Sequence, residues 1–283
     1  MINVQWLLQS NHPNLPGIGE IAAILRDQGC DVHAVALKGH SAEIPDTGTL
    51  DLSRPVVCYG PSFVPRALKY RELSPGIFFD TGMFRWSAFH EGWGDLMISA
   101  DAVVTDTAAA VSRLGSRTMF VRPDEDSKAF DGGLFDAGSL NAVVAQAIEK
   151  GHINAGTPVV VAEALPIDME WRIFVVGRQV VAASSYRKDG VGNINLSVPY
   201  RVVDLAFEAA DRWAPAEVFC LDIARSGDRY GIVEANCFNA SRFYGADAIA
   251  ILGSVSSLAS RMFETKEVSE QLPILPPEPP AAP

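Results

Sequence analysis

The spacing of apolar and polar positions over the first hundred residues alternates between a helical and a strand-like period. A repeat typical of an amphipathic helix spans residues 18–29 and closes at Gly29. Apolar runs around it predict strands, at residues 2–8, 31–37, 55–60 and 76–79. Because strands that alternate with helices are typical of a small parallel sheet, we expect an α/β lobe over residues 1–97.

The later part of the chain has a different order of elements. Helices are predicted at residues 87–98, 106–115, 139–151 (with Ser139 as the cap), 202–212 and 246–264, and single strands at residues 119–123 and 158–165. Two longer segments alternate as strands on both sides of a glycine-containing turn, at residues 170–187 and 217–236. Antiparallel hairpins after a parallel lobe predict an α+β protein with two further lobes that contain antiparallel sheets.

Composition and charge narrow the function classes. The chain has 283 residues, 48% of them hydrophobic and 20% charged, which is ordinary for a globular protein. A net charge of −11 excludes the electrostatic footprint of nucleic-acid binding. The four cysteines lie in or beside apolar runs without a C-x-x-C pair, and no run is as long as a membrane span. We therefore expect a cytoplasmic protein with no membrane partner, and a proline-rich disordered tail over residues 267–283.

Two carboxylates and an amide interrupt the apolar pattern of the second hairpin. Asp222 lies on its first strand, and Glu234 and Asn236 share one face of its second strand. Antiparallel pairing can bring all three to one face, where such oxygen ligands suit Mg²⁺. The alternative is an edge hairpin with solvated polar side chains. Carboxylates in apolar strands need a partner or a metal ion, which favours the metal site.

A second group of candidates follows the strand at residues 119–123. Arg122 ends this strand, and Lys128 lies in a polar loop with Gly132 and Gly133. Two cations and free backbone N–H groups can surround phosphate oxygens there, although the chain has no Walker sequence. The alternative is a solvated loop in which Lys128 offsets its acidic neighbours, and without further information that alternative is the better explanation.

The third group surrounds the connector before the first hairpin. The backbone of Glu163, Ala164 and Leu165 can pair with an adenine edge, and Glu170 can accept hydrogen bonds from ribose hydroxyls. Arg172 shares a face with Glu170, and these two side chains can equally form a plain ion pair within a strand.

The order of these three groups resembles the ATP-grasp superfamily of ATP-dependent carboxylate–amine ligases. The resemblance covers residues 98–266, with a central lobe at about 98–157 and a C-terminal lobe at about 158–266, and residues 1–97 resemble the α/β lobe that precedes this fold. It implies Asp222, Glu234 and Asn236 as Mg²⁺ ligands, two ions, and ATP as the nucleotide. The residues implied to contact ATP are Arg122, Lys128, Glu163, Ala164, Leu165 and Glu170.

Two positions set this chain apart from most of the family. Arg122 stands where most members have a phosphate-binding Lys, and with Lys128 in the loop this is similar to an atypical clade of bacteria and phages. Several ligases place an Arg two residues before the hairpin Asp to hold an acyl phosphate, and here that residue is Cys220. The resemblance leaves Arg172 and Arg242 as the candidates for this catalytic role.

The function that the resemblance implies is formation of an amide or peptide bond through an acyl phosphate, between small-molecule or peptide carboxylate and amine substrates. The alternatives are an ATP-dependent kinase on the same fold, and a nucleotide-binding module without ligase activity. Residues 189–199, with two glycines, are a candidate lid. The sequence predicts neither the identity of the two substrates nor the oligomeric state.

Overall fold

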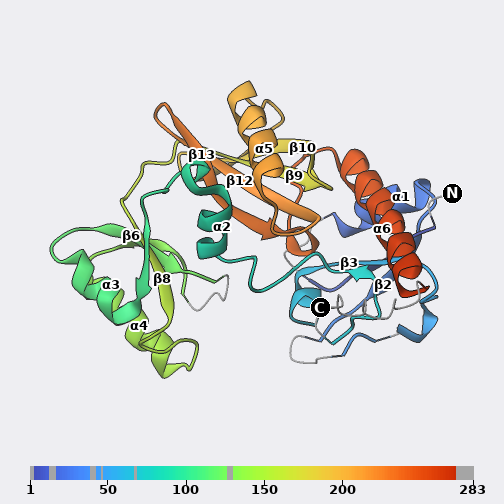
Figure 1. Ribbon diagram of the computed structural model, residues 1–283, viewed down its shortest axis with the longest axis horizontal. Coiled ribbons are helices and arrows are strands. Elements are labelled where there is room, and N and C mark those ends of the chain that lie inside the picture. Colours follow the sequence, from blue (N-terminus) through green and yellow to red (C-terminus); the bar gives the residue numbers. More distant parts are fainter. Residues whose placement is uncertain are drawn as a thin grey trace, which may run out of the picture. The chain divides into compact units, whose positions relative to one another are not determined.

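The computed structural model describes residues 3–12, 17–38, 43–45, 47–66, 69–125 and 130–271, with side chains to residue 265. The chain divides into two compact units (Figure 1). One contains the residues up to Ile77 and the chain from Leu252 onward, and the other runs from Phe78 to Ile251. The boundaries predicted near residues 97 and 157 remain predictions.

The first unit contains the expected parallel sheet. Its strand order is β2-β1-β3-β4, with β1 at Gln5–Gln9, β2 at Asp31–Val35, β3 at Val56–Tyr59 and β4 at Pro75–Gly76. Its helices are α1 (Ile18–Asp27) and two short 3₁₀ turns, η1 (Thr47–Thr49) and η2 (Pro61–Arg66). Apolar side chains from strands and loops form its core, including Leu7, Val56 and Phe63.

The last helix, α6 (Ala248–Gln271), contributes to the same unit. The indole Nε1 of Trp6 on β1 donates a buried hydrogen bond of 3.0 Å to Ser256 Oγ on α6. The helix also extends five residues into the segment predicted as a disordered tail, so that prediction is wrong for residues 267–271. Glu, Lys and Gln in this stretch favour a helix, and the next proline is Pro273. Residues 272–283 lie outside the described part.

Two antiparallel sheets make up the second unit. The smaller sheet has the order β5-β8-β6-β7, with β5 at Val103–Asp106, β6 at Met119–Pro123, β7 at Gly133–Phe135 and β8 at Pro158–Ala162. Helices α3 (Thr107–Leu114) and α4 (Ala137–Glu149) lie beside it (Figure 1). Their apolar faces pack on the sheet through Leu114, Leu140 and Val144. The cap of α4 is Asp136 and not Ser139, whose side chain completes a capping box instead.

The larger sheet carries the residues with chemical potential. Its order is β11-β10-β9-β12-β13, and its strands are β9 (Met169–Val176), β10 (Gln179–Lys188), β11 (Val191–Asn195), β12 (Val218–Ser226) and β13 (Arg229–Cys237). Both predicted hairpins are present. The first turns at Gly177 and Arg178, both with positive φ, which matches the right-handed twist of the strands.

Helix α5 (Tyr200–Arg212) lies across one face of the larger sheet and contacts β9, β10, β12 and β13 (Figure 1). Helix α2 (Trp86–Trp93) contacts both α5 and β13. Two 3₁₀ turns complete the unit, η3 (Gly94–Leu96) and η4 (Phe238–Ala240). Because α5 and its neighbours cover one face, the polar side chains of the central strands gather on the other. Among the described residues, none of the helices is long and apolar enough to cross a membrane.

Candidate functional site

The hairpin of β12 and β13 brings the three predicted metal ligands together. Asp222 pairs directly with Glu234, and Cys220 pairs with Asn236. Paired residues of an antiparallel ladder point to the same face, and so do residues two apart on one strand. A β-bulge follows Asp222, so the register beyond it shifts by one residue. The oxygens of Asp222, Glu234 and Asn236 therefore share one face.

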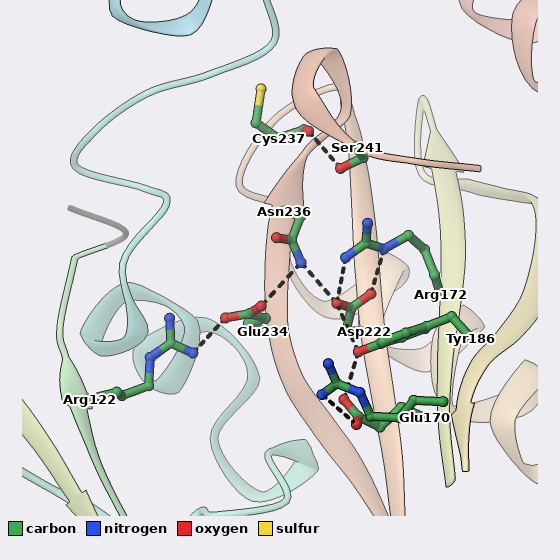
Figure 2. Close-up of polar contacts among 10 residues, drawn as sticks. Arg122, Glu170, Arg172, Tyr186, Asp222, Glu234, Asn236, Cys237 and Ser241 are labelled. Carbon is green, nitrogen blue, oxygen red and sulfur yellow. Dashed lines mark hydrogen bonds and ion pairs between the residues drawn. The ribbon is translucent and has the colours of Figure 1, made fainter. Parts of the chain in front are cut away.

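The side chains converge as well as sharing a face (Figure 2). The Nδ2 atom of Asn236 donates to Asp222 Oδ2 at 3.0 Å and to Glu234 Oε1 at 3.3 Å. Rotation of the amide by half a turn exchanges this nitrogen for the carboxamide oxygen, which would face the same carboxylates. Two carboxylates and an amide that can present oxygen are hard donors. This set therefore fits Mg²⁺.

Arg172 holds Asp222 from the neighbouring strand β9, where the two residues are register partners. Its Nε donates to Asp222 Oδ1 at 2.8 Å and its Nη2 donates to Oδ2 at 2.7 Å. Asp222 is 2% exposed and Arg172 is 8% exposed. Burial alone would lower the pKa of Arg172, but the carboxylate of Asp222 raises this pKa well above its ordinary value. The pair is thus a buried, bidentate salt bridge.

Tyr186 on β10 connects this pair to Glu170 on β9 (Figure 2). Its hydroxyl donates to Glu170 Oε2 at 2.6 Å and lies 3.4 Å from Asp222 Oδ2. Burial, followed by the carboxylates of Asp222 and Glu170, raises the pKa of Tyr186 far above its usual range. Arg187 Nη1 donates to the other oxygen of Glu170 at 3.1 Å. The predicted ribose acceptor is therefore held in place by two side chains from β10.

Arg122 approaches the same site from β6 of the smaller sheet. Its Nη1 donates to Glu234 Oε2 at 2.5 Å, and both side chains are largely buried. The predicted phosphate-binding cation and a predicted metal ligand therefore contact one another (Figure 2). The shared location supports the view that these two groups serve one ligand.

A cavity of about 520 Å³ surrounds these residues, within the size range of small-molecule sites. Its polar lining includes Arg122, Glu163, Glu170, Arg172, Tyr186, Arg187, Asp222 and Glu234, and its apolar lining includes Ile98, Phe120, Leu134, Leu165, Ile167 and Val233. A hollow of about 360 Å³ shares Phe120, Arg122, Gly132 and Glu234 with it. The combination of charged groups and apolar surface is suited to a molecule with an anionic and a planar apolar part.

The structure separates the remaining predicted residues. Glu163 and Leu165 line the cavity, and Ala164 lies between them in the connector of β8 and β9. Glu163 is exposed and pairs with Arg117 at 3.2 Å. Arg242 is exposed on the segment after η4 and does not line the cavity. Lys128 lies outside the described residues.

The interior position of Cys220 is fixed by β12. The thiol is fully buried, and burial raises its pKa to about 12. An uncharged thiol at this position cannot supply the positive charge that an Arg would supply. The predicted consequence, that another residue must fill that role, remains a prediction.

Sequence reasoning missed Tyr186 and Tyr244, which also line the cavity. Their rings stack with centroids 5.0 Å apart, and the guanidinium carbon of Arg172 lies 5.6 Å from the first ring and 5.2 Å from the second. A β-bulge between Ser185 and Arg187 breaks the alternation of β10 at Tyr186. For that reason a strict two-residue period does not reveal which face Tyr186 occupies. Residues 191–195, expected in a lid loop, form the edge strand β11.

Comparison with known proteins agrees with this geometry. A family model of the ATP-grasp domain, the second family of its clade, matches residues 100–253, more than half of the chain. No curated protein matched the sequence.

Solved structures of similar fold are ATP-grasp enzymes. D-alanine–D-alanine ligase from Bacillus anthracis superposes with a TM-score of 0.63 and 11% identity, covering 94% of this chain and all of that one. A RimK domain ATP-grasp protein from Sphaerobacter thermophilus gives a TM-score of 0.62 and 15% identity, covering 90% and 99%. The ATP-grasp ligase PsnB, complexed with a phosphomimetic variant of its minimal precursor, Mg and ADP, gives 0.54 and 15%, covering 92% and 98%.

At these identities the superpositions establish the fold, and the family model establishes the family. The predicted ATP-grasp fold is confirmed. The chain belongs to the ATP-grasp superfamily, as a member of this ATP-grasp domain family.

Proposed function

We propose that this protein is an ATP- and Mg²⁺-dependent ligase that joins a carboxylate to an amine. The observation that carries the proposal is the convergence of Asp222, Glu234 and Asn236 beside Arg122 at one cavity. Metal ligands and a phosphate-binding cation in contact fit a nucleotide triphosphate that is bound with its metal ion. Membership of the ATP-grasp superfamily supports ATP as this nucleotide.

Each part of the nucleotide has proposed partners. Asp222, Glu234 and Asn236 hold Mg²⁺, in one or two ions, which neutralises phosphate charge when bound. Arg122, with Lys128, donates to phosphate oxygens. The connector of Glu163, Ala164 and Leu165 contacts adenine, and Leu165 adds to the apolar lining beside it. Glu170 accepts from the ribose, and its orientation is supported by Tyr186 and Arg187.

The proposed reaction has two steps. An oxygen of the substrate carboxylate attacks the γ-phosphorus, the bond from that phosphorus to the bridging oxygen breaks, and ADP leaves. The amine nitrogen then attacks the carbonyl carbon of the acyl phosphate, phosphate leaves, and the nitrogen loses a proton to give the amide. Preorganised cations stabilise the charge that moves during transfer, and no protein nucleophile is required.

The acyl phosphate needs its own positive partner because Cys220 supplies none. Of the two arginines considered for this role, Arg172 lines the cavity and Arg242 does not. Arg172 is therefore the favoured candidate. It would have to share its guanidinium between Asp222 and the acyl phosphate, and the Nη1 atom is available to do so because only Nε and Nη2 contact Asp222.

The direct test measures ADP release over a panel of carboxylates, including peptides, with and without amines. Release that requires both a carboxylate and an amine is expected of the ligase. Release that requires only one hydroxyl or carboxylate acceptor, with a stable phosphorylated product, would favour the kinase. Nucleotide binding without turnover over the whole panel would favour a binding module.

A further inference from the structure

Each of the three carboxylates proposed to contact MgATP has an arginine partner. Arg172 binds Asp222, Arg122 binds Glu234 at 2.5 Å, and Arg187 binds Glu170 at 3.1 Å. The site is thus balanced in charge within itself, although the chain carries a net charge of −11. A site of this kind does not attract a lone cation in the way that an uncompensated carboxylate cluster would.

The two carboxylates proposed as metal ligands are also fully engaged as hydrogen-bond acceptors. Asp222 accepts from Arg172 through both oxygens, and its Oδ2 also accepts from Asn236. Glu234 accepts from Arg122 through Oε2 and from Asn236 through Oε1. A cation that coordinates either carboxylate must therefore displace or weaken a charge-assisted hydrogen bond.

We propose that Arg122 and Arg172 compete with the divalent cation for the carboxylates of Glu234 and Asp222, so that the cation and the triphosphate bind interdependently. The inference rests on the proposed function. Phosphate oxygens are the natural alternative partners of a guanidinium. When both ligands arrive, the carboxylates exchange arginine for metal and the arginines exchange carboxylate for phosphate. Either ligand alone leaves one half of this exchange unpaired, and the two bindings are coupled.

The cation arm of the test uses Mn²⁺ alone as a probe, with free Mn²⁺ measured by electron paramagnetic resonance. Arg122→Met and Arg172→Met should bind Mn²⁺ about tenfold more tightly than the wild type, within the usual range of such couplings. Arg225→Met is the matched control. Arg225 lies on the same strand as Asp222 and pairs with Asp168 at 3.6 Å, so this substitution removes the same charge away from the site.

The anion arm measures binding of AMPPNP in excess EDTA. Glu234→Gln releases Arg122, so metal-free AMPPNP should bind about tenfold more tightly than to the wild type. Its control is Asp168→Asn, which removes one negative charge from the Arg225 pair. A residue that only ligates metal would give no such gain beyond the control.

The outcomes separate the inference from the function. Equal Mn²⁺ affinity for Arg122→Met and Arg225→Met, together with equal AMPPNP affinity for Glu234→Gln and Asp168→Asn, overturns the competition. Tight binding of AMPPNP with Mg²⁺ to the wild type would leave the proposed function standing in that case. Failure of the wild type to bind AMPPNP with or without Mg²⁺ overturns both. Arg122 is partly exposed, so its variant keeps the test valid if Arg172→Met does not fold.

Discussion

The pair of Arg172 and Asp222 shows how one residue changes the meaning of another. Sequence reasoning had assigned Asp222 to a metal ion and Arg172 to an acyl phosphate. The structure places both within one buried, bidentate salt bridge. Removal of one partner from such a pair leaves an uncompensated charge in the interior. This pair therefore contributes to stability as well as to any chemistry at the site.

Replacing Arg172 by Met should lower the free energy of unfolding by about 3–5 kcal/mol. The reason is that Asp222 would remain buried without its charge partner. A second substitution, Asp222→Asn, should recover part of the loss. Urea denaturation gives these values, and Arg225→Met should cost less than about 1 kcal/mol because its pair is more exposed. Wild-type stability of Arg172→Met would contradict the structural role.

The cysteines give a second prediction at this scale. All four are buried, and burial raises the pKa of Cys58 and of Cys220 to about 12. The thiolate is the reactive form, so a disulfide reagent at pH 8 should modify the folded protein slowly. Unfolding in guanidinium should expose four fast-reacting thiols. Rapid modification of Cys220 in the folded protein would contradict its interior position.

At the scale of elements, the strong periodic segments were predicted and the short ones were missed. Both long hairpins and the helix at residues 18–27 follow from apolar spacing and turn glycines. Strands β5 and β7 have four and three residues, too few for a period to be visible. The bulges after Asp222 and around Tyr186 cannot be read from alternation, although they set which side chains face the cavity.

The candidate site was predicted to a similar extent. The ordered series of Arg122, Glu170, Asp222, Glu234 and Asn236 was recognised in the sequence, and the structure brings these residues to one cavity or its edge. Their mutual contacts depend on long-range pairing between strands, and the sequence contains no local signal for it. The aromatic rings of Tyr186 and Tyr244 were missed for the same reason.

Gly231 fixes the position of β13, the strand of Glu234 and Asn236. A Cβ atom there would lie 2.5 Å from the backbone nitrogen of Ile98, whose N–H bonds Ile232 O at 2.8 Å. Because the obstacle is backbone, Gly231→Ala should cost about 1–3 kcal/mol of stability and weaken nucleotide binding. Thermal unfolding and AMPPNP titration measure both effects. Gly192→Ala, with no atom within 4 Å of its Cβ, is the control, and equal behaviour of the two variants would contradict this packing.

At the scale of the whole molecule, the two ends of the described chain belong to one unit. Trp6 on the first strand and Ser256 on the last helix share a buried hydrogen bond, and Cys30 lies 3.6 Å from the same hydroxyl. Most of the second unit, from Phe78 to Ile251, is therefore inserted in sequence between the parts of the first. The family match at residues 100–253 falls almost entirely within this inserted unit.

Ser256→Ala should lower the stability of the first unit by about 1 kcal/mol, because Trp6 loses its Ser256 acceptor. Urea denaturation followed by tryptophan fluorescence measures the change. The neighbouring Ser257, whose hydroxyl bonds Gly253 O within the helix and is exposed, supplies the control Ser257→Ala. An effect of Ser256→Ala no larger than that of Ser257→Ala would contradict the link between the chain ends.

The acidic character of the molecule makes its local arginines important. With a net charge of −11, binding of a triphosphate depends on a metal ion and on the few cations at the cavity. The account as a whole therefore depends on the cluster of Asp222, Glu234 and Asn236.

The most direct measurement is calorimetric titration of AMPPNP at saturating Mg²⁺ into the wild type, Asp222→Asn and Glu234→Gln, with Asp168→Asn as the control. We expect the wild type and the control to bind with similar affinity, and the two site variants to lose at least roughly tenfold. Binding of AMPPNP with Mg²⁺ to both site variants as tightly as to the wild type would contradict the account.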